Sequence, residues 1–197
     1  ASAQGISQVY AGVSNRKFEN YTYNTLVSNY SLGAVTVGLS GNYFSSLIVP
    51  TTDVYNISVL QGTAYGSSSP ASYQSTLNSQ AQYQSYVPNN YTKFNAYYSK
   101  NFATTEMSNF LLTLSGQAAS DNLNSAENFY VSGPSGVRAY LPGSIYGSQG
   151  GMVNTEYNYQ VMRNTSVGAF YDFARVQQYK NANSQIINAN TSPNVYN

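Results

Sequence analysis

Apolar or aromatic side chains alternate with polar ones along most of this chain, and this period of two constrains the fold more than any other feature. In the segment Met152–Val161, one set of alternate positions holds Val153, Thr155, Tyr157, Tyr159 and Val161, and the other holds Asn154, Glu156, Asn158 and Gln160. Successive side chains of a β-strand point to opposite faces, so this segment predicts a strand between an apolar and a wet environment. Helical periodicity is scarce, and the pattern therefore predicts an all-β fold.

Roughly seven segments of this kind follow one another, most of them about 9–12 residues long, which is the length that a tilted membrane strand needs. They are Gly5–Ser14, Ser31–Asn42, Asp53–Gly62, Tyr91–Phe102, Asn109–Ala119, Met152–Val161 and Ser166–Val176. In the last segment, Phe170 and Asp172 share the face that we assign to the inside, and Tyr171 and Phe173 share the outer face.

Short and long connections alternate between these segments. The long ones are Asn15–Tyr30, Thr63–Asn90, Ser120–Gly150 and the tail after Gln177. Outer-membrane barrels have short periplasmic turns and longer extracellular loops, so the alternation predicts an antiparallel transmembrane β-barrel with all four long segments on one side. A soluble β-sandwich shows a similar alternation, and the pattern alone leaves it open.

The composition favours the membrane alternative. Only 8% of the 197 residues are charged, against about 25% in an ordinary soluble domain. The 21 Tyr and 15 Gly suit strands with aromatic residues at the membrane interfaces, and a mean hydropathy of −0.35 is compatible with alternating strands. No stretch approaches the ~18 consecutive apolar residues of a spanning helix. No signal peptide opens the chain, so we expect that any export signal has been removed or lies outside this sequence.

Several kinds of chemistry lack the residues that they need. The chain has no Cys and no His, which excludes disulfides, thiol nucleophiles, His-based triads and the commonest metal ligands. No spacing among the few carboxylates singles out a catalytic pair, and no basic stripe predicts binding of nucleic acid. The Gly-containing stretch Ser144–Gly151 lacks the Lys and the helix of a nucleotide-binding loop. We therefore predict no enzyme, no cofactor, no nucleotide and no metal site.

The most specific stretch of sequence is Ser125–Tyr140, SAENFYVSGPSGVRAY, which is followed by FYDFARV at Phe170–Val176. In order and spacing these elements resemble the pore-forming transporters of two-partner secretion, of the haemolysin-activator or filamentous-haemagglutinin-transporter type. Members of that family carry a segment of the form SSEKFxLGGPxGVRAYP and, later, a strand reading FYDxGRV. The matching positions of the first segment are Ser125, Glu127, Phe129, Gly133, Pro134, Gly136, Val137, Arg138, Ala139 and Tyr140.

The resemblance implies a bacterial outer-membrane β-barrel in which a lid loop, Ser120–Gly150 in this chain, folds back into the lumen. It also implies that the arginine of the loop pairs with the aspartate of the FYD strand, and these positions are Arg138 and Asp172. The alternation places Asp172 on the inward face independently. An arginine suits such a pair because its planar fork can make two hydrogen bonds to one carboxylate.

The other motif residues have simpler interpretations. Gly133, Pro134 and Gly136 are expected to shape the turn at the loop tip, and Tyr140 to pack on the inner wall or to lie on the surface. Glu127 and Glu156 flank the loop and are interpreted as polar lining of the lumen.

Two positions depart from the family pattern. Ser132 stands where a second Gly is usual, and Ala174 stands where the strand motif has Gly, so its methyl group would come close to the loop. Arg175 belongs to the face opposite Asp172.

The family's barrel has roughly twice as many strands, and small periplasmic domains that bind the substrate precede it. We therefore expect residues 1–197 to form only part of such a barrel. The implied function is a passive pore that exports an unfolded exoprotein of the haemagglutinin or haemolysin type. Two alternatives stay open: a secreted structural protein, such as a β-sandwich, filament or surface-layer subunit, and a related barrel that inserts other barrels.

Overall fold

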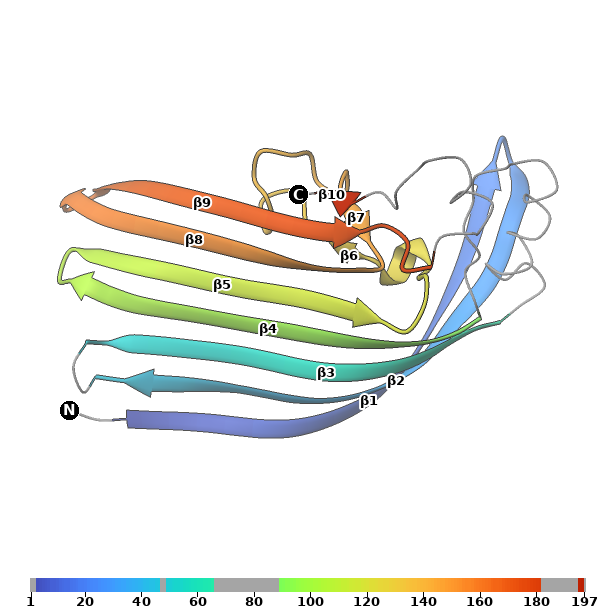
Figure 1. Ribbon diagram of the computed structural model, residues 1–197, viewed down its shortest axis with the longest axis horizontal. Helices are drawn as coiled ribbons and strands as arrows, with labels where there is room; N and C mark the ends of the chain where they lie inside the picture. Colours follow the sequence, from blue (N-terminus) through green and yellow to red (C-terminus); the bar gives the residue numbers. More distant parts are fainter. Residues whose placement is uncertain (1–2, 47–48, 66–88, 182–194, 197) are drawn as a thin grey trace.

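The computed structural model describes residues 3–46, 49–65, 89–181 and 195–196, and these form one long antiparallel sheet (Figure 1). The order of its strands is β1-β2-β3-β4-β5-β8-β9-β10. Their bounds are β1 Ala3–Thr22, β2 Thr25–Ser45, β3 Thr51–Tyr65, β4 Asn90–Thr105, β5 Ser108–Ala119, β8 Gln149–Met162, β9 Thr165–Gln177 and β10 Val195–Tyr196. The short strands β6 (Phe129–Tyr130) and β7 (Tyr146–Gly147) pair in a second small sheet, and η1 (Ser125–Glu127) is one turn of 3-10 helix.

The all-β prediction is confirmed, and each of the seven predicted segments lies within one long strand of the sheet. The strands are longer than expected, with 12–21 residues in each. Sequence alternation finds the part of a strand that has one apolar face, and it misses the polar ends, where both faces meet water. The predicted long connection at Thr63–Asn90 and the tail after Gln177 lie largely outside the described residues.

The prediction of a long loop at Asn15–Tyr30 is wrong. β1 and β2 continue through this segment as a paired hairpin, and Thr22 faces Thr25 across a two-residue turn. The turn residues Tyr23 and Asn24 have φ angles of 47° and 63°. Positive φ at both central residues is the geometry of a type I′ hairpin, whose twist matches that of its two strands. The polar, Asn-rich sequence looked like a loop because neither face of this extension is apolar enough to show alternation.

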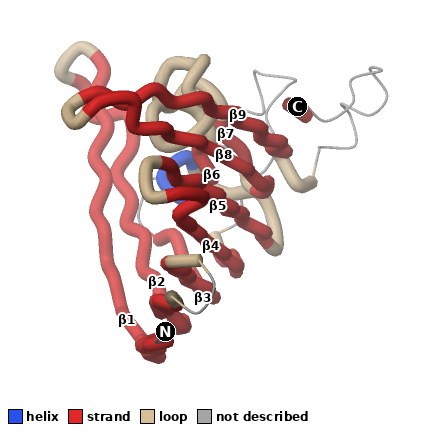
Figure 2. Tube along the Cα trace, turned by 90° about the vertical axis from the view of Figure 1, so that its left-hand side faces the viewer, coloured by secondary structure: helices blue, strands red, loops and turns tan. Residues whose placement is uncertain are grey.

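The sheet is strongly curved, and its concave side contains the lid loop. Seen along the strands, the sheet bends from β1 to β9, and η1 lies on its inner side (Figure 2). The turns β4–β5 and β8–β9 lie at one end of the sheet, whereas the β1–β2 hairpin tip and the lid loop lie at the other (Figure 1). Because β5 ends at Ala119 and β8 begins at Gln149, the loop between them comprises residues 120–148, and we keep for it the name lid loop from the family resemblance.

The two faces of the sheet differ as the alternation predicts. Strand register places Asp172 beside Asn154, Asn154 beside Thr113 and Thr113 beside Ser99, all on the concave face. The convex face carries a band of exposed apolar and aromatic side chains: Val9, Val13, Val35, Val37, Leu39, Ile57, Val59, Phe94, Leu114, Tyr157, Val167, Tyr171 and Phe173.

Ion pairs stand at both ends of this convex band. Lys100 Nζ lies 3.1 Å from Asp53 Oδ1 near the short turns, and Lys17 Nζ lies 2.6 Å from Glu19 Oε1 on the hairpin extension. An apolar belt between two charged rims is the surface that a membrane wall requires. In the described part of the chain, none of the helices has the length and apolar character to cross a bilayer.

A pair of adjacent substitutions tests which face meets lipid. Val37 lies in the convex band, and its neighbour Thr36 lies on the concave face opposite Gly12, where the structure leaves open space. In the full-length protein we expect Val37→Arg to destabilise the barrel by about 2–4 kcal/mol and Thr36→Arg by about 1 kcal/mol or less. Urea unfolding in lipid vesicles, followed by the heat-modifiable band on gels, measures the difference. Equal losses from the two variants would contradict the assignment of the faces.

Candidate functional site

The tip of the lid loop, residues 129–147, is a compact turn that two glycines make possible. Gly133 has a φ of +100°, a conformation that side chains disfavour, and its carbonyl accepts a hydrogen bond of 2.9 Å from Gly136 N. A methyl group on Gly136 would collide with the carbonyl of Val131. Val137 N donates to that same carbonyl at 2.7 Å, so the chain folds tightly back on itself immediately before Arg138.

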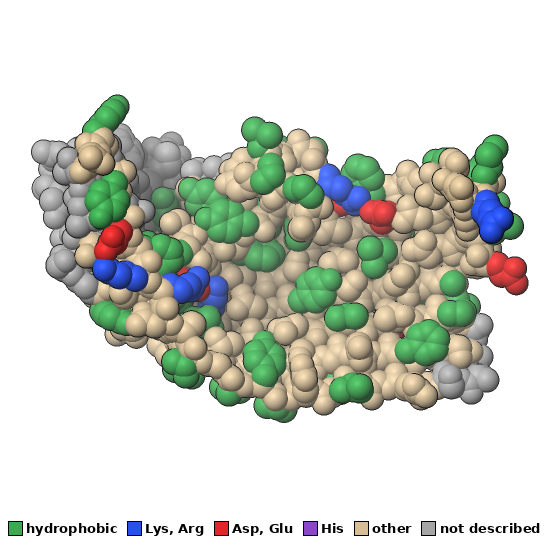
Figure 3. Space-filling view, turned by 180° about the vertical axis from the view of Figure 1, so that it is seen from behind, with side chains coloured by type: hydrophobic (Ala, Val, Ile, Leu, Met, Phe, Trp, Pro, Cys, Tyr) green, Lys and Arg blue, Asp and Glu red, His purple; other side chains and the backbone are tan. Residues whose placement is uncertain are grey.

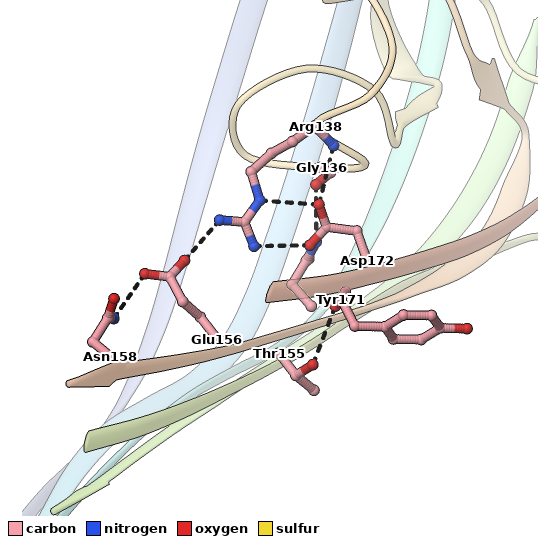
Figure 4. A network of polar contacts seen from close by, with 8 residues as sticks. Gly136, Arg138, Thr155, Glu156, Asn158, Tyr171 and Asp172 are labelled. Carbon is pink, nitrogen blue, oxygen red and sulfur yellow. Dashed lines mark hydrogen bonds and ion pairs between the residues drawn. The ribbon is translucent and has the colours of Figure 1, made fainter. Parts of the chain in front are cut away.

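Arg138 joins this turn to two strands of the wall (Figure 4). Its Nε donates to Asp172 Oδ2 at 2.9 Å, and its Nη2 donates to Asp172 Oδ1 at 3.0 Å, which makes a two-pronged contact. The backbone N of Arg138 also donates to Asp172 Oδ2, at 3.1 Å. The remaining guanidinium nitrogen, Nη1, donates to Glu156 Oε2 at 2.7 Å. One loop residue therefore binds carboxylates on both β8 and β9.

Two asparagines of β8 complete the network. Asn154 Nδ2 donates to Asp172 Oδ1 and to the carbonyl of Gly136, both at 2.8 Å, so it bridges the wall and the turn. Asn158 Nδ2 donates to Glu156 Oε1 at 2.8 Å. The carboxylate of Asp172 therefore accepts four hydrogen bonds, of which three come from Arg138.

The two carboxylates differ in exposure, and this difference ranks their contributions. The Asp172 side chain is only 4% exposed, whereas those of Glu156 and Arg138 are 33% and 28% exposed. Charge pairs that exclude water interact more strongly than pairs that water screens. The guanidinium also lies 3.8 Å from the centre of the Phe170 ring, in cation–π contact. Its hydrogen bonds to Asp172, and then to Glu156, raise the pKa of Arg138, so the side chain stays charged.

Apolar packing supports the ion pairs. Val131, Met152, Ala174 and Val176 form a buried cluster, and the loop residues Phe129, Val137 and Ile145 pack against it. Ala174, which departs from the family's Gly, is part of this contact, and its methyl group fits under the tip. Ser132, the other departure, accepts a hydrogen bond of 3.1 Å from Ile145 N through its Oγ. Ala174 therefore adds a contact between the wall and the tip, and Ser132 adds one within the tip.

The other motif residues lie around this contact. Gly133 and Gly136 are buried, whereas Pro134 and Ala139 are exposed. Tyr140 is about half exposed, and it lines a small cavity of about 150 Å³ with Val137 and Asp172. The sequence left open whether Tyr140 packs on the inner wall or lies on the surface. Its side chain does both in part, since it borders the cavity beside the wall and also meets solvent. Arg175 is exposed and lines a groove on the convex side, away from the network.

Sequence reasoning missed the part that Glu156 plays. Glu156 lines the concave face, and it is in addition the second carboxylate partner of Arg138. The signal was present in the alternation, which put Glu156, Asn154 and Asp172 on one face, but the register that brings β8 beside β9 was needed to see the group. In the described ranges, no three acidic side chains are close enough to form a metal site.

Comparison with known proteins identifies the family to which a chain with this geometry belongs. The family model of the haemolysin secretion/activation proteins ShlB, FhaC and HecB matches residues 2–192 of the chain. The chain belongs to this family. Its members include transporters of the bacterial outer membrane, and the sheet is part of such a barrel, as the sequence predicted.

Two curated relatives and one solved structure are similar to the chain. The heme/hemopexin transporter protein HuxB of Haemophilus influenzae (strain 86-028NP) is 26% identical over 164 residues, which are 81% of this chain and 28% of that protein. A second HuxB sequence from Haemophilus influenzae is 26% identical over 155 residues, which are 77% of this chain and 26% of that protein. CdiB from Escherichia coli has the same fold, with a TM-score of 0.66 and 19% identity over 87% of this chain and 31% of that structure. The chain thus spans less than a third of the length of each of these proteins.

The unequal exposure of the two carboxylates leads to a measurable difference between them. We expect Asp172→Asn to destabilise the docked tip by about 3–5 kcal/mol, because it leaves much of a partly buried guanidinium unpaired. Glu156→Gln should cost only about 0–1 kcal/mol, because water screens this pair. Rates of protease cleavage within the tip, measured on the folded full-length protein, report both values. Equal cleavage of the two variants would show that Asp172 is not the dominant partner.

Proposed function

We propose that this chain forms part of a pore in the outer membrane through which an unfolded exoprotein of the haemagglutinin or haemolysin type leaves the cell. The observation that carries the proposal is the Arg138 contact, which joins a loop on the concave face to two strands of the wall. A loop in this position occupies the space that a transported chain would need. The exoprotein can therefore pass only when the loop yields, and the contact sets how readily it does so.

The polar concave face suits an unfolded passenger. Facing side chains there are mostly uncharged, such as Ser40, Asn56, Ser99 and Asn101, and they can exchange hydrogen bonds with an extended chain as well as with water. The view from the side opposite to Figure 1 shows a largely uncharged surface, on which hydrophobic side chains are scattered and charged side chains form a few small groups (Figure 3). Few charged groups on such a surface would hold a passing chain by strong electrostatic attraction.

The transport that we propose is passive. The chain is assigned no catalytic step, cofactor, nucleotide or nucleic-acid partner, and folding of the exoprotein outside the cell would supply the direction of movement. The convex apolar band is assigned to contact with outer-membrane lipid, since a barrel wall exposes such side chains only where hydrocarbon replaces water.

The strength of the Arg138 contact suits a switch. Breaking a buried pair costs about 3–5 kcal/mol, and each ~1.4 kcal/mol changes an equilibrium constant about tenfold. Moving a two-state element from 1:99 to 99:1 takes about 5.5 kcal/mol. The engaged exoprotein would therefore need to compensate for only a few kcal/mol to release the tip.

A charge exchange tests the proposal. Single variants Arg138→Asp and Asp172→Arg should each reduce secretion, because like charges would face each other across the contact. The exchange of both charges should restore part of the secretion only when Glu156→Gln is also present, since Glu156 would otherwise repel the new aspartate. The backbone hydrogen bond from residue 138 to Asp172 is lost in the exchange, so we expect partial recovery.

The measurement is a comparison of the proteins in the culture medium of strains that carry each variant and a strain without the protein. Wild type should export at least one large protein that the strain without it does not. Absence of any such protein would contradict the export function. Export by wild type, with no recovery in the triple variant and with the barrel still assembled, would remove the ion pair from the mechanism.

A further inference from the structure

The lid loop has a second contact with the sheet, at its other end. Its first limb, residues 121–128, crosses the concave face on the side of β1–β5. Ala126 packs against a buried cluster of Tyr30, Leu32 and Ala64, and Leu123 belongs to a second cluster with Tyr91 and Ala119. The hydroxyl of Tyr30 donates to Asn124 Oδ1 at 3.2 Å, and Asn124 Oδ1 also caps η1 by accepting a hydrogen bond of 2.9 Å from Ala126 N.

Glu127 is the charged centre of this contact. Its side chain is only 2% exposed, and its two carboxylate oxygens face cations from two different strands. Arg16 of β1 pairs with Oε1, and Lys93 Nζ of β4 lies 2.8 Å from Oε2. Lys93 Nζ also donates to the backbone carbonyl of Glu127 at 3.2 Å.

A glutamine of β5 links Glu127 to Ser148, the last residue of the lid loop. Gln117 Nε2, which is buried, donates at 3.1 Å to the carbonyls of both Glu127 and Ser148. Leu123 N donates to Ser148 Oγ at 3.0 Å. The first limb is therefore fixed to the sheet and to the start of β8 together.

The contacts of Glu127 are more specific than its interpretation as polar lining of the lumen predicts. A carboxylate as buried as Glu127 is costly unless nearby charges compensate for the lost water. Here a cation faces each of its two oxygens. Lys93 is 12% exposed, so it would become an unpaired and nearly buried charge if Glu127 were neutral. The cations that face Glu127 come from β1 and β4, whereas the carboxylates that face Arg138 come from β8 and β9.

We infer that Glu127 is a positioning residue that anchors the first limb independently of Arg138, so that during export only the tip moves. The inference rests on the proposed export function. It restricts the path of the exoprotein, because the first limb keeps covering β1–β4 while release of the tip exposes the wall of β8 and β9. The unfolded chain would therefore pass along the β8–β9 side of the lumen.

Site-specific labelling can separate the two anchors, because this chain contains no cysteine of its own. Ala126→Cys reports on the first limb and Val137→Cys on the tip, and a membrane-impermeant maleimide is the probe. In the full-length protein without exoprotein, we expect Glu127→Gln to raise the labelling rate at position 126 at least tenfold and to change position 137 less than twofold. Arg138→Gln should do the reverse. If either variant exposes both positions equally, the loop is one rigid unit and the inference is wrong.

Labelling during export tests the path. With the exoprotein expressed, position 137 should become labelled at least fivefold faster while position 126 stays protected. Labelling of both positions during export would overturn the inference even if export itself is normal. The anchoring test needs no exoprotein, so its result stands apart from a failure of the export function.

A milder variant covers the case in which Glu127→Gln prevents assembly of the barrel. Arg16→Gln removes only one cation, from a side chain that is 44% exposed. We expect it to raise labelling at position 126 about threefold and to leave position 137 unchanged. Glu127→Asp, which keeps the charge, should raise labelling at position 126 less than Glu127→Gln does. A change at position 137 in the Arg16 variant would contradict the independence of the two anchors.

Discussion

The contact between Asp172 and Arg138 decides where the tip of the lid loop lies relative to the wall. Apolar packing helps to hold the loop on the concave face, and a contact that water cannot easily replace is needed to fix the position of Arg138. Asp172 provides such a contact, because it is almost fully buried and accepts four hydrogen bonds. The tight turn at Gly133 and Gly136, the apolar cluster around Val131 and the bridging of Asn154 all serve to bring Arg138 to this carboxylate.

The paired strands of the wall that carries Asp172 meet the requirement that the membrane sets for backbone hydrogen bonds. A chain that spans hydrocarbon must satisfy its backbone hydrogen bonds internally, and paired strands do so while leaving alternate side chains to face lipid and water. Each strand of this sheet therefore has one side on which a charged group is costly and one on which it is tolerated. Asp172 of β9 and Glu156 of β8 both lie on the side where a charged group is tolerated.

Much of the strand order and of the Arg138 contact could be predicted from the sequence. Alternation is a local signal, and it correctly placed Asp172 and Asn154 inward and Tyr171 outward, because the face of a residue depends only on its own strand. The motif around Arg138 added its partner through resemblance to a family. The β1–β2 extension was missed, since its two polar faces give no periodic contrast and Tyr23–Asn24 is not an obvious turn of two residues.

Long-range contacts were beyond local reasoning. Glu156 joins Arg138 because β8 and β9 pair in one register, and Glu127 meets Arg16 because curvature brings β1 toward a loop that leaves β5. More than 100 positions separate Arg16 from Glu127 in the chain, and neither residue's neighbours indicate the other.

The length of the β1–β2 hairpin has a consequence for how its sequence can change. Arg16 points inward only because of its place in the alternation of β1, and its partner across the strands is Leu32. Loss or gain of a single residue within β1 on the side of Gly12 would turn Arg16 toward the convex face, away from Glu127. Beyond the pair of Phe18 and Tyr30, which packs against the first limb, the hairpin can lengthen or shorten by whole cross-strand pairs without disturbing the contacts of Arg16. Natural variation in length should therefore gather at the outer end of this hairpin and occur in matched steps on its two strands.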